Sequence, residues 1–537
     1  MKKLPTGRQN FAALIQEDLL YVDKTRQIYE LIDSGNLYFL SRPRRFGKSL
    51  LLSTLKQLFR GKKDLFKGLY IAEKTDYDWT AYPVLHFNFA ELGHKILNLE
   101  ELLIEIIQEQ AKEFKIKVRA KSLSSQVKSL VKKIAKKTGQ PVVFLVDEYD
   151  KPIIDFLTKK DQAKRNQATL RDFFSPLKSL EEKGHLRFLF ITGVSKFSKV
   201  SVFSDLNNLT DLTIHELSYD LLGITHKELH TYFEAYIQQA SQKLNLSKER
   251  LLEGLRLSYD GYSYDGATFL YNPYSLLNFF GANRFGNFWF STGTPTFLVE
   301  TIQSEQVNPT ELEGLKVSET FFDKFNIDNL DIYSLLFQTG YLTIKKIWLK
   351  GFSLRYELGY PNGEVQRSFI HGLLEAFTYK KTTIVSNALV CIEQALEEGQ
   401  IEVFIQQLKV LLADISYHLF PKNKTEPTQE DLRKEFDRWE GYFQTIIYLI
   451  TSFLGFSVQA EVTKHKGRLD LIAETGDFLY IMEFKLEEPA KDAIAQIKSR
   501  EYAMAYYNSS KRVFLVGVGF SKSQRNVESW EEEEWKR

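Results

Sequence analysis

The sequence predicts an α/β protein with three parts: an N-terminal parallel sheet with flanking helices, a helical middle domain and a C-terminal α/β domain. Over the first 225 residues, short apolar runs typical of buried strands alternate with segments of helical periodicity, which is the pattern of a parallel sheet with crossover helices. The final stretch instead reads helix, strand, strand, strand, helix, strand. We therefore divide the chain into residues 1–225, 226–375 and 376–537, with the core of the last domain at about 432–522.

Four apolar runs define the predicted N-terminal sheet. They are rich in β-branched and aromatic residues and are bounded by turn-forming residues. The runs are residues 37–41, 83–89, 141–146 and 186–192. A helix is expected after the first run, because leucines recur at near-helical spacing from position 50 to 58.

The middle domain contains short aromatic segments interrupted by glycine and proline. Residues 259–262, Tyr-Asp-Gly-Tyr, and residues 271–274, Tyr-Asn-Pro-Tyr, are of this kind. Such segments predict turns between packed helices.

Composition limits the classes of protein that fit. The chain has 537 residues, and 71 Lys and Arg against 69 Asp and Glu give a net charge of +2, which excludes a histone-like protein but not a local basic groove. One cysteine excludes a disulfide scaffold and a cysteine zinc site. The longest apolar stretch, residues 442–456, is shorter than the roughly 20 residues of a membrane span, and no secretory signal is expected. We predict a cytoplasmic protein without membrane contact, and a solvated or frayed terminus at the acidic run 531–534.

A glycine-containing loop follows the first predicted strand. Residues 41–49 read Ser-Arg-Pro-Arg-Arg-Phe-Gly-Lys-Ser and nearly match G-x-x-x-x-G-K-[ST], a loop whose N–H groups surround phosphates at the N-terminus of a helix. Gly47 permits close approach of the backbone. Lys48 is expected to reach the β- and γ-phosphates and Ser49 to bind Mg²⁺. Arg42 replaces the first glycine of the pattern.

Residues near Gly47, Lys48 and Ser49 are further candidates for nucleotide binding. Arg44 and Arg45 either contact phosphates, including as an arginine finger, or pair with local carboxylates. Phe46 completes the loop. Three residues of the preceding segment are candidates to cap the nucleotide base: Tyr21, Asp23 and Lys24.

A buried strand that ends in two carboxylates provides the second half of a nucleotide site. Residues 142–148 read Val-Val-Phe-Leu-Val-Asp-Glu; Asp147 is expected to hold Mg²⁺ through water and Glu148 to polarise the attacking water. A strand can also end in charge because it reaches solvent, but the upstream loop favours the catalytic interpretation. The next strand ends at Thr192, whose hydroxyl would sense the γ-phosphate. Together these features predict a P-loop NTPase domain that binds ATP.

The last domain contains a predicted β-hairpin with two opposed carboxylates. With residues 476–477, Gly-Asp, as a two-residue turn, Asp470 faces Glu483 at about 5 Å between Cβ atoms. Lys485 and Arg468 share their face. A divalent cation, Mg²⁺ or Mn²⁺, would relieve the repulsion of the carboxylates. Lys485 would orient the attacking water or stabilise negative charge on phosphorus.

A structural ion cluster is the alternative interpretation of this hairpin. In it Arg468 and Lys485 neutralise Asp470 and Glu483 on an exposed face of the sheet. Glu461, on a strand expected at residues 458–463, favours the metal interpretation because it can join the two carboxylates as a ligand.

The pattern of Asp470 followed by Glu483, Phe484 and Lys485, flanked by helices, resembles the PD-(D/E)XK nuclease superfamily. The resemblance implies that Asp470 and Glu483 bind metal and that Lys485 is the catalytic lysine. It further implies that Glu440 is the glutamate of the first helix and Gln496 the auxiliary residue of the last one. The proline that usually precedes the first aspartate is absent.

The whole chain resembles a bacterial family that joins an AAA-ATPase-like N-terminal domain to a PD-(D/E)XK domain. Arg42, unusual for the general phosphate loop, fits this family's version of it. The matching stretches cover nearly all of the chain and comprise the hairpin and residues 21–25, 41–49, 147–150, 192–196, 271–273, 290–295, 337–341 and 361–365.

We expect an ATP-binding and ATP-hydrolysing, Mg²⁺-dependent nuclease whose N-terminal domain gates the C-terminal phosphodiesterase site. Nucleic acid is the expected partner, DNA rather than RNA, and a homo-oligomer is a further expectation because AAA-type ATPases often complete one subunit's site with an arginine from the next. The alternative is an ATP-driven regulatory or sensor switch whose nuclease-like domain binds nucleic acid without cutting it.

Overall fold

The chain divides into two compact units. The computed structural model describes residues 1–91, 98–196, 202–290, 298–299, 301–302, 307, 309–323, 331–413, 429–455 and 469–536, without the side chains of 310, 323, 429–438, 440, 469 and 470. The first unit comprises Met1–Thr294 and Leu312–Val365, and the second comprises Pro295–Glu311 and Gln366–Arg537. The finer division into three domains stays a prediction.

A five-stranded parallel sheet forms the centre of the N-terminal part of the first unit. Its strand order is β2–β3–β4–β1–β5. The four predicted strands are confirmed, and they are buried because helices cover both faces of the sheet. The strands are β1 (Leu37–Ser41), β2 (Val84–Asn88), β3 (Val142–Asp147), β4 (Leu186–Gly193) and β5 (Thr210–Asp211).

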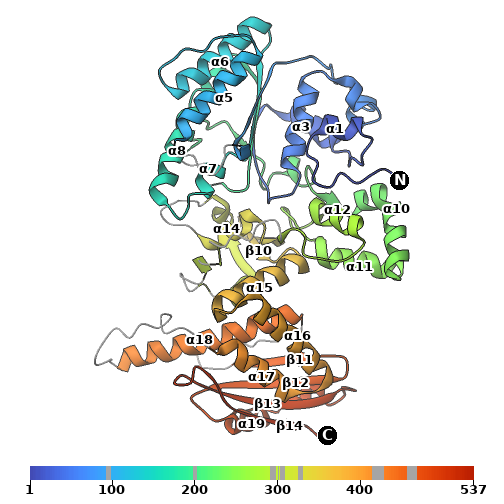
Figure 1. The fold of residues 1–537 in the computed structure, drawn as a ribbon, viewed down its shortest axis with the longest axis vertical. Coiled ribbons are helices and arrows are strands. Elements are labelled where there is room, and N and C mark those ends of the chain that lie inside the picture. Colours follow the sequence, from blue (N-terminus) through green and yellow to red (C-terminus); the bar gives the residue numbers. More distant parts are fainter. Residues whose placement is uncertain are drawn as a thin grey trace. The chain divides into compact units, whose positions relative to one another are not determined.

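The helices of this part pack on the two faces of the sheet. Figure 1 shows α3 on one side and α5, α6 and α8 on the other. α3 starts at Lys48, directly after the glycine loop, and buries the leucines at 51, 52, 55 and 58. The helices are α1 (Phe11–Gln16), α2 (Thr25–Ser34), α3 (Lys48–Phe59), α4 (Tyr70–Glu73), α5 (Leu99–Glu113), α6 (Leu123–Thr138), α7 (Lys151–Ile154), α8 (Lys160–Phe174) and α9 (Leu177–Glu182).

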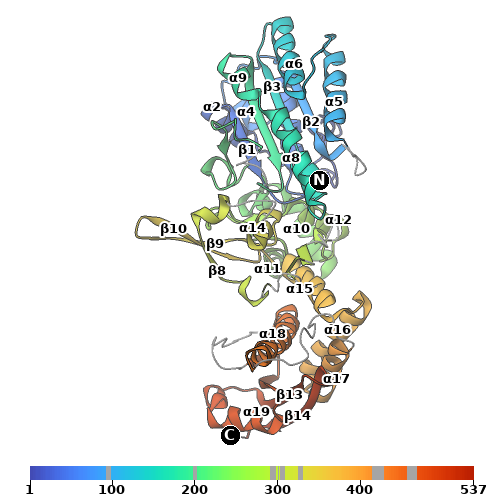
Figure 2. The same ribbon diagram turned by 90° about the vertical axis from the view of Figure 1, so that its left-hand side faces the viewer.

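The remainder of the first unit is largely helical, as predicted, and includes two small sheets. α10 begins with a capping box in which Thr225 and Glu228 each accept the other's backbone N–H. A three-stranded antiparallel sheet, β8–β10–β9, was not foreseen from the sequence; in Figure 2 its β9–β10 hairpin extends away from α14. The elements are β6 (Ile224–Thr225), α10 (His226–Leu244), α11 (Lys248–Tyr259), β7 (Leu270–Tyr271), α12 (Pro273–Ala282), β8 (Leu315–Ser318), α14 (Ile332–Thr339), β9 (Thr343–Lys350) and β10 (Ser353–Gly359).

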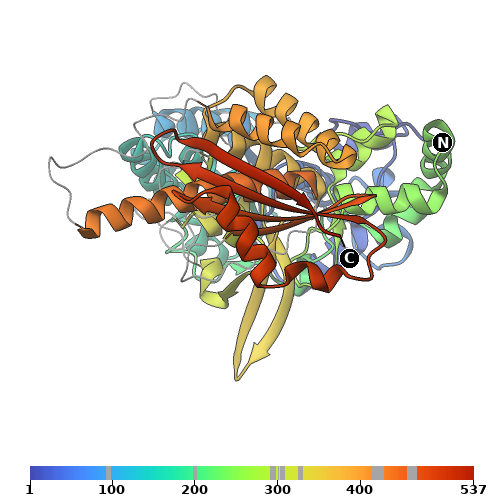
Figure 3. The same cartoon turned by 90° about the horizontal axis from the view of Figure 1, so that it is seen from below.

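The second unit is built on a four-stranded mixed sheet in the order β11–β12–β13–β14. β12 and β13 are parallel and the two outer pairs are antiparallel. Figure 3 shows the red strands between the orange helices α16 and α17 and the red helix α19. The elements are α15 (Gly363–Thr378), α16 (Thr382–Glu398), α17 (Ile401–Leu412), α18 (Gln429–Leu454), β11 (Leu469–Glu474), β12 (Phe478–Leu486), α19 (Ala490–Ser499), β13 (Arg512–Ser521) and β14 (Asn526–Glu534).

The acidic run 531–534 is solvated, as expected, but it is not frayed. It forms the end of β14 and pairs with β13 from Phe514 to Gly517. Cations of neighbouring elements hold it, because Lys498 lies 2.6 Å from Glu533 and Arg512 lies 2.9 Å from Glu534. Four identical residues in a row show no apolar–polar alternation, so no period-two signal marked this strand.

The described ranges contain no helix that is long and apolar enough to span a membrane.

Candidate functional site

The phosphate loop lies between β1 and α3, as predicted. Gly47 precedes α3 in the left-handed conformation with a φ of 100°, which a residue with a Cβ adopts only under strain. Arg45 also has a positive φ, of 64°. The chain therefore turns sharply before α3, and the unpaired N–H groups at the start of that helix face the loop.

Lys48 folds back over its own loop. Its side chain is 5% exposed, and its Nζ donates hydrogen bonds to the carbonyl oxygens of Arg42, at 2.9 Å, and Pro43, at 2.8 Å. Burial lowers the pKa of Lys48, and nearby carboxylates, Glu148 foremost, oppose this effect. Two neutral oxygen atoms therefore fix the ammonium group.

Arg42 explains the departure from the general glycine pattern. Its buried guanidinium donates to the carbonyl oxygens of Thr213, at 2.8 Å, and Ser218, at 2.9 Å. It also lies 3.5 Å from the ring centroid of Tyr264. These partners are distant in the sequence, so Arg42 ties the base of the phosphate loop to two other segments of the first unit.

The two carboxylates at the end of β3 have different surroundings. Asp147 is buried and accepts a hydrogen bond of 2.7 Å from the hydroxyl of Thr192, which is itself fully buried. The predicted γ-phosphate sensor is thus engaged with Asp147. Glu148 has a φ of 51°, an uncommon conformation for a residue other than glycine. Backbone strain of this kind is concentrated at functional sites.

Asp150 belongs to the same site although sequence analysis gave it no role. Its Oδ2 accepts hydrogen bonds from the backbone N–H groups of Val194, at 3.0 Å, and Ser195, at 2.7 Å, and from the Ser195 hydroxyl at 2.8 Å. Burial raises the pKa of Asp150 to about 6 in spite of these bonds. The signal in the sequence was a second aspartate three positions beyond Asp147. Its carboxylate holds the end of β4 against the end of β3.

A cavity of about 260 Å³ brings most of the predicted nucleotide-binding residues together. Cations line it from the phosphate loop, and carboxylates line it from the segment after β3. The predicted residues on its wall are Arg44, Arg45, Gly47, Lys48, Ser49 and Glu148, and the additional ones include Asp150, Lys151 and Asp155. Phe46, Asp147 and Thr192 are buried and do not line this cavity. The mixture of cations and hard oxygen donors fits a polyphosphate with Mg²⁺.

A second cavity, of about 110 Å³, shares Gly47 and Leu50 with the first one. Its walls are mainly apolar and include Phe46, Tyr21 and residues 221–224. Phe46, which the sequence assigned to the nucleotide site, therefore faces this apolar cavity. An apolar space that adjoins a polyphosphate site fits a nucleobase.

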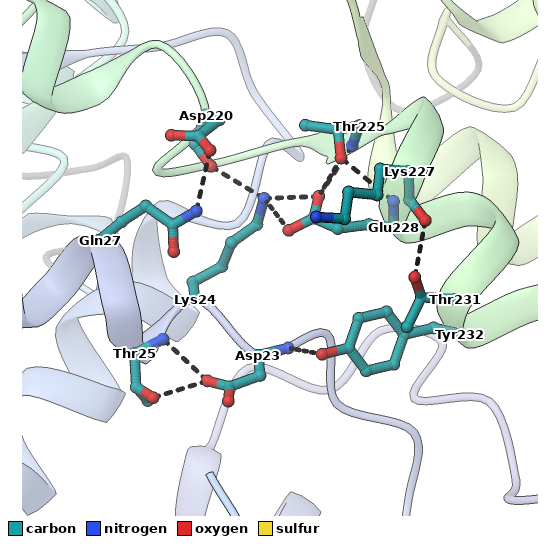
Figure 4. Close-up of polar contacts among 10 residues, drawn as sticks. All are labelled: Asp23, Lys24, Thr25, Gln27, Asp220, Thr225, Lys227, Glu228, Thr231 and Tyr232. Atoms are coloured by element: carbon teal, nitrogen blue, oxygen red, sulfur yellow. Dashed lines mark hydrogen bonds and ion pairs between the residues drawn. The ribbon is translucent and has the colours of Figure 1, made fainter. Parts of the chain in front are cut away.

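Lys24 lies at this second cavity and is held by a polar network (Figure 4). Its Nζ lies 2.7 Å from a carboxylate oxygen of Glu228 and donates to the carbonyl oxygen of Asp220 at 2.8 Å. Asp23 accepts hydrogen bonds from the backbone N–H of Thr25, at 2.8 Å, and from its hydroxyl, at 2.7 Å. Lys24 and Asp23, which were expected to help cap the base, are therefore engaged with the protein itself.

In the second unit, the hairpin of β11 and β12 has the predicted register. Asp470 pairs with Glu483 and Glu474 pairs with Leu479. The N–H of Thr475 donates to the carbonyl oxygen of Phe478 at 2.9 Å, which leaves residues 476–477 as the two-residue turn.

Glu483 and Lys485 lie on the face of the sheet that α19 covers. Glu483 is fully buried, and the Nζ of Lys485 is 3.5 Å from its Oε1. Lys485 also donates a hydrogen bond of 2.6 Å to Oε1 of Gln496 on α19. The structure thus brings Glu483, Lys485 and Gln496 together. The ion-cluster interpretation required an exposed face, which does not fit a buried Glu483.

Three predicted residues of the nuclease site lack described side chains. Asp470 lies on β11 and Glu440 on α18 by their backbones, and Glu461 lies outside the described residues. Within the described part of the chain, no three His, Cys, Asp or Glu side chains are close enough to hold a metal ion. The donor chemistry of an opposed Asp and Glu nevertheless fits Mg²⁺ or Mn²⁺, which prefer carboxylate oxygens.

The fold and the two sites define a class of protein: a chain with a phosphate-loop α/β domain followed by a nuclease-like α/β domain. Comparison with known families agrees, since residues 5–203 match the model of a predicted AAA-ATPase and residues 438–530 match that of the PD-(D/E)XK nuclease superfamily. The chain is also 34% identical over 536 residues to an uncharacterized protein in the vnfD 5′ region of Azotobacter chroococcum mcd 1, with 98% of each chain covered.

The protein therefore belongs to the family of AAA-ATPase-like proteins with a C-terminal PD-(D/E)XK nuclease domain. No solved structure matches the chain.

Proposed function

We propose that this protein is an ATP-binding and ATP-hydrolysing, Mg²⁺-dependent nuclease that cuts DNA in the cytoplasm. The observation that carries the nuclease part is the buried Glu483, which pairs with Asp470 across the hairpin and lies 3.5 Å from Lys485. A buried carboxylate opposite a second one is costly unless cations neutralise the pair, and a metal ion with an adjacent lysine provides that charge.

At the N-terminal site, the polar cavity accepts the phosphates and the apolar cavity accepts the adenine base. Lys48 exchanges its two carbonyl acceptors for phosphate oxygens, and Arg44 and Arg45 contribute further positive charge from the wall of the same cavity. Ser49 and Asp147 would hold a Mg²⁺ ion, which would neutralise charge on the phosphates. Glu148 polarises the attacking water.

At the C-terminal site, we assign Asp470, Glu483 and Glu461 as the residues that would hold a divalent metal, and Glu440 as a further catalytic residue. The metal supplies Lewis-acid chemistry at the scissile phosphate. Lys485 orients the attacking water and stabilises developing negative charge. Gln496 positions Lys485, because its amide oxygen accepts a hydrogen bond from the ammonium group. ATP binding or hydrolysis in the first unit gates this site. The protein assembles into a homo-oligomer.

Cleavage of end-labelled linear DNA and of circular DNA, with Mg²⁺ and ATP present, tests the nuclease assignment. The wild-type protein should cut and Asp470→Ala should not. Asp477→Ala, an exposed residue in the turn of the same hairpin, is the matched control and should cut like the wild type. Equal cutting by wild type and Asp470→Ala would overturn the assignment. Binding without cutting by the wild type would favour the alternative, a switch that only binds nucleic acid.

A second experiment tests the ATPase assignment separately. Glu148→Gln removes the group that polarises water but leaves the loop intact, so this variant should bind ATP and hydrolyse it at least about 100-fold more slowly than the wild type. Hydrolysis at the wild-type rate contradicts the role of Glu148.

A further inference from the structure

Segments of the first unit that are far apart in the sequence converge on the phosphate loop. Pro43 packs against Gly340 at the end of α14, where a Cβ would come within 2.6 Å of the proline ring. Phe46 packs edge-on against Tyr262 with ring centroids 5.0 Å apart. The carbonyl oxygen of Arg44 accepts a hydrogen bond of 3.0 Å from the indole N–H of Trp289. These contacts serve none of the nucleotide-binding roles assigned above.

Trp289 connects the loop to a buried carboxylate. Its side chain is mostly buried and packs edge-on against Tyr341, with ring centroids 5.3 Å apart. Its backbone N–H donates to Oε1 of Glu364 at 2.6 Å, and the hydroxyl of Ser275 donates to Oε2 of Glu364 at 2.6 Å. Hydrogen bonds to a buried charge are strong, and losing one partner is costly.

Glu364 stands in the first turn of α15, where a carboxylate interacts favourably with the helix dipole. The two units meet in sequence between Val365 and Gln366, inside this helix. A hydrogen-bonded chain therefore runs from the carbonyl of Arg44, through the two N–H groups of Trp289, to the start of the helix that continues into the second unit.

Binding of a phosphate would act on the loop end of this hydrogen-bonded path through Lys48. The ammonium of Lys48 is bound to the carbonyls of Arg42 and Pro43, the two residues before Arg44, and a phosphate would compete for it. Arg42 is fixed by Thr213 and Ser218, and Pro43 is wedged against Gly340. The next peptide group, at Arg44, is the one that Trp289 holds.

We propose that Trp289 and Glu364 are the positioning residues through which occupation of the phosphate loop alters the start of α15. Neither residue lines the polar cavity. The inference rests on the proposed binding of ATP and deepens the gating step by naming the residues that carry it. If phosphate binding at the loop changes the start of α15, a change at the start of α15 must alter phosphate binding by the same free energy.

Hydrogen exchange of the backbone amides of residues 366–370, measured on the full chain with and without a saturating non-hydrolysable ATP analogue and Mg²⁺, tests this link. In the wild type the analogue should slow exchange there by about fivefold or more. In Trp289→Phe, which keeps an aromatic ring but lacks the indole N–H, the slowing should fall below about twofold. Affinity is measured in parallel so that each variant is compared at saturation.

Trp348→Phe, on β9, is the matched control and should respond like the wild type. If Trp289→Phe does not fold, Ser275→Ala removes one hydrogen bond from Glu364 and should reduce the response. Equal slowing in wild type and Trp289→Phe would overturn the link, as would a wild type that binds the analogue without any change in α15. A wild type that does not bind the analogue would instead overturn the proposed function.

Discussion

The two units hold the lysine of their candidate sites in different ways. Lys48 donates to backbone carbonyls of its own loop, whereas Lys485 donates to the side-chain amide of Gln496 on a separate helix. Both hydrogen-bond acceptors are neutral, but Lys485 also lies 3.5 Å from a carboxylate oxygen of the buried Glu483. Backbone acceptors couple the lysine to the shape of its loop, while a side-chain acceptor leaves the strand unchanged when the lysine moves. Ligand binding at the first site can therefore change the conformation of the phosphate loop, whereas the second site keeps a fixed backbone geometry.

The largest expected effects separate the two lysines. Lys48→Ala should lower ATP hydrolysis by about 100-fold or more, because the cavity loses the cation that reaches the phosphates. Lys485→Ala should lower DNA cleavage by a similar factor and leave ATP hydrolysis within about twofold of the wild type. Both activities are measured for both variants. Loss of ATP hydrolysis in Lys485→Ala would contradict the assignment of the two lysines to separate activities.

The next effect concerns how firmly the first loop is anchored. Arg42→Gly restores the general glycine pattern, yet it should lower the free energy of unfolding by about 3 kcal/mol or more. The reason is that the carbonyls of Thr213 and Ser218 lose their buried donor. Urea unfolding measures the change, and Arg42→Lys, which keeps the charge but not the fork of donors, should lie in between. A stable Arg42→Gly variant contradicts the anchoring role.

A smaller effect depends on pH. Burial raises the pKa of Asp150 from 3.8 to about 6 in the folded protein, so the folded state binds this proton more tightly than the unfolded state. Its contribution to stability is present below about pH 4 and is lost as the pH rises through about 6. The stability of the wild type relative to Asp150→Asn should therefore fall by about 2 kcal/mol between pH 4 and pH 7. Urea unfolding at both pH values measures it; a constant difference would refute the assigned pKa.

The smallest effect concerns the acceptor of Lys485 at the second site. Gln496→Ala removes the acceptor of Lys485, so DNA cleavage should fall by about 10-fold while ATP hydrolysis stays unchanged. Ser499→Ala, on the same helix, is the control. If the two variants cut equally well, Gln496 does not position the lysine.

Local patterns predicted the parts of both sites that depend on neighbours in the sequence. The two-residue turn at 476–477 was enough to pair Asp470 with Glu483, because side chains alternate strictly along a strand. The start of α3 followed in the same way from the glycine loop. The strands of the N-terminal sheet followed from continuous apolar runs.

Long-range contacts were not predictable from such patterns. The partners of Arg42 at residues 213, 218 and 264 lie at least 171 positions from it in the sequence, and no local signal marks them. The same holds for Trp289 and Arg44. β9 and β10 could have been found, since residues 343–350 alternate partly between apolar and charged side chains, but the aromatic turns nearby favoured a helical interpretation.

The acidic end of β14 has a consequence for how the protein behaves in concentrated solution. β14 is the last strand of its sheet, and an open strand edge is a template on which another chain can add a strand. Four successive glutamates at residues 531–534 place like charges along that edge. Two molecules that approached edge to edge would bring these carboxylates together, and we expect their repulsion to disfavour such pairing.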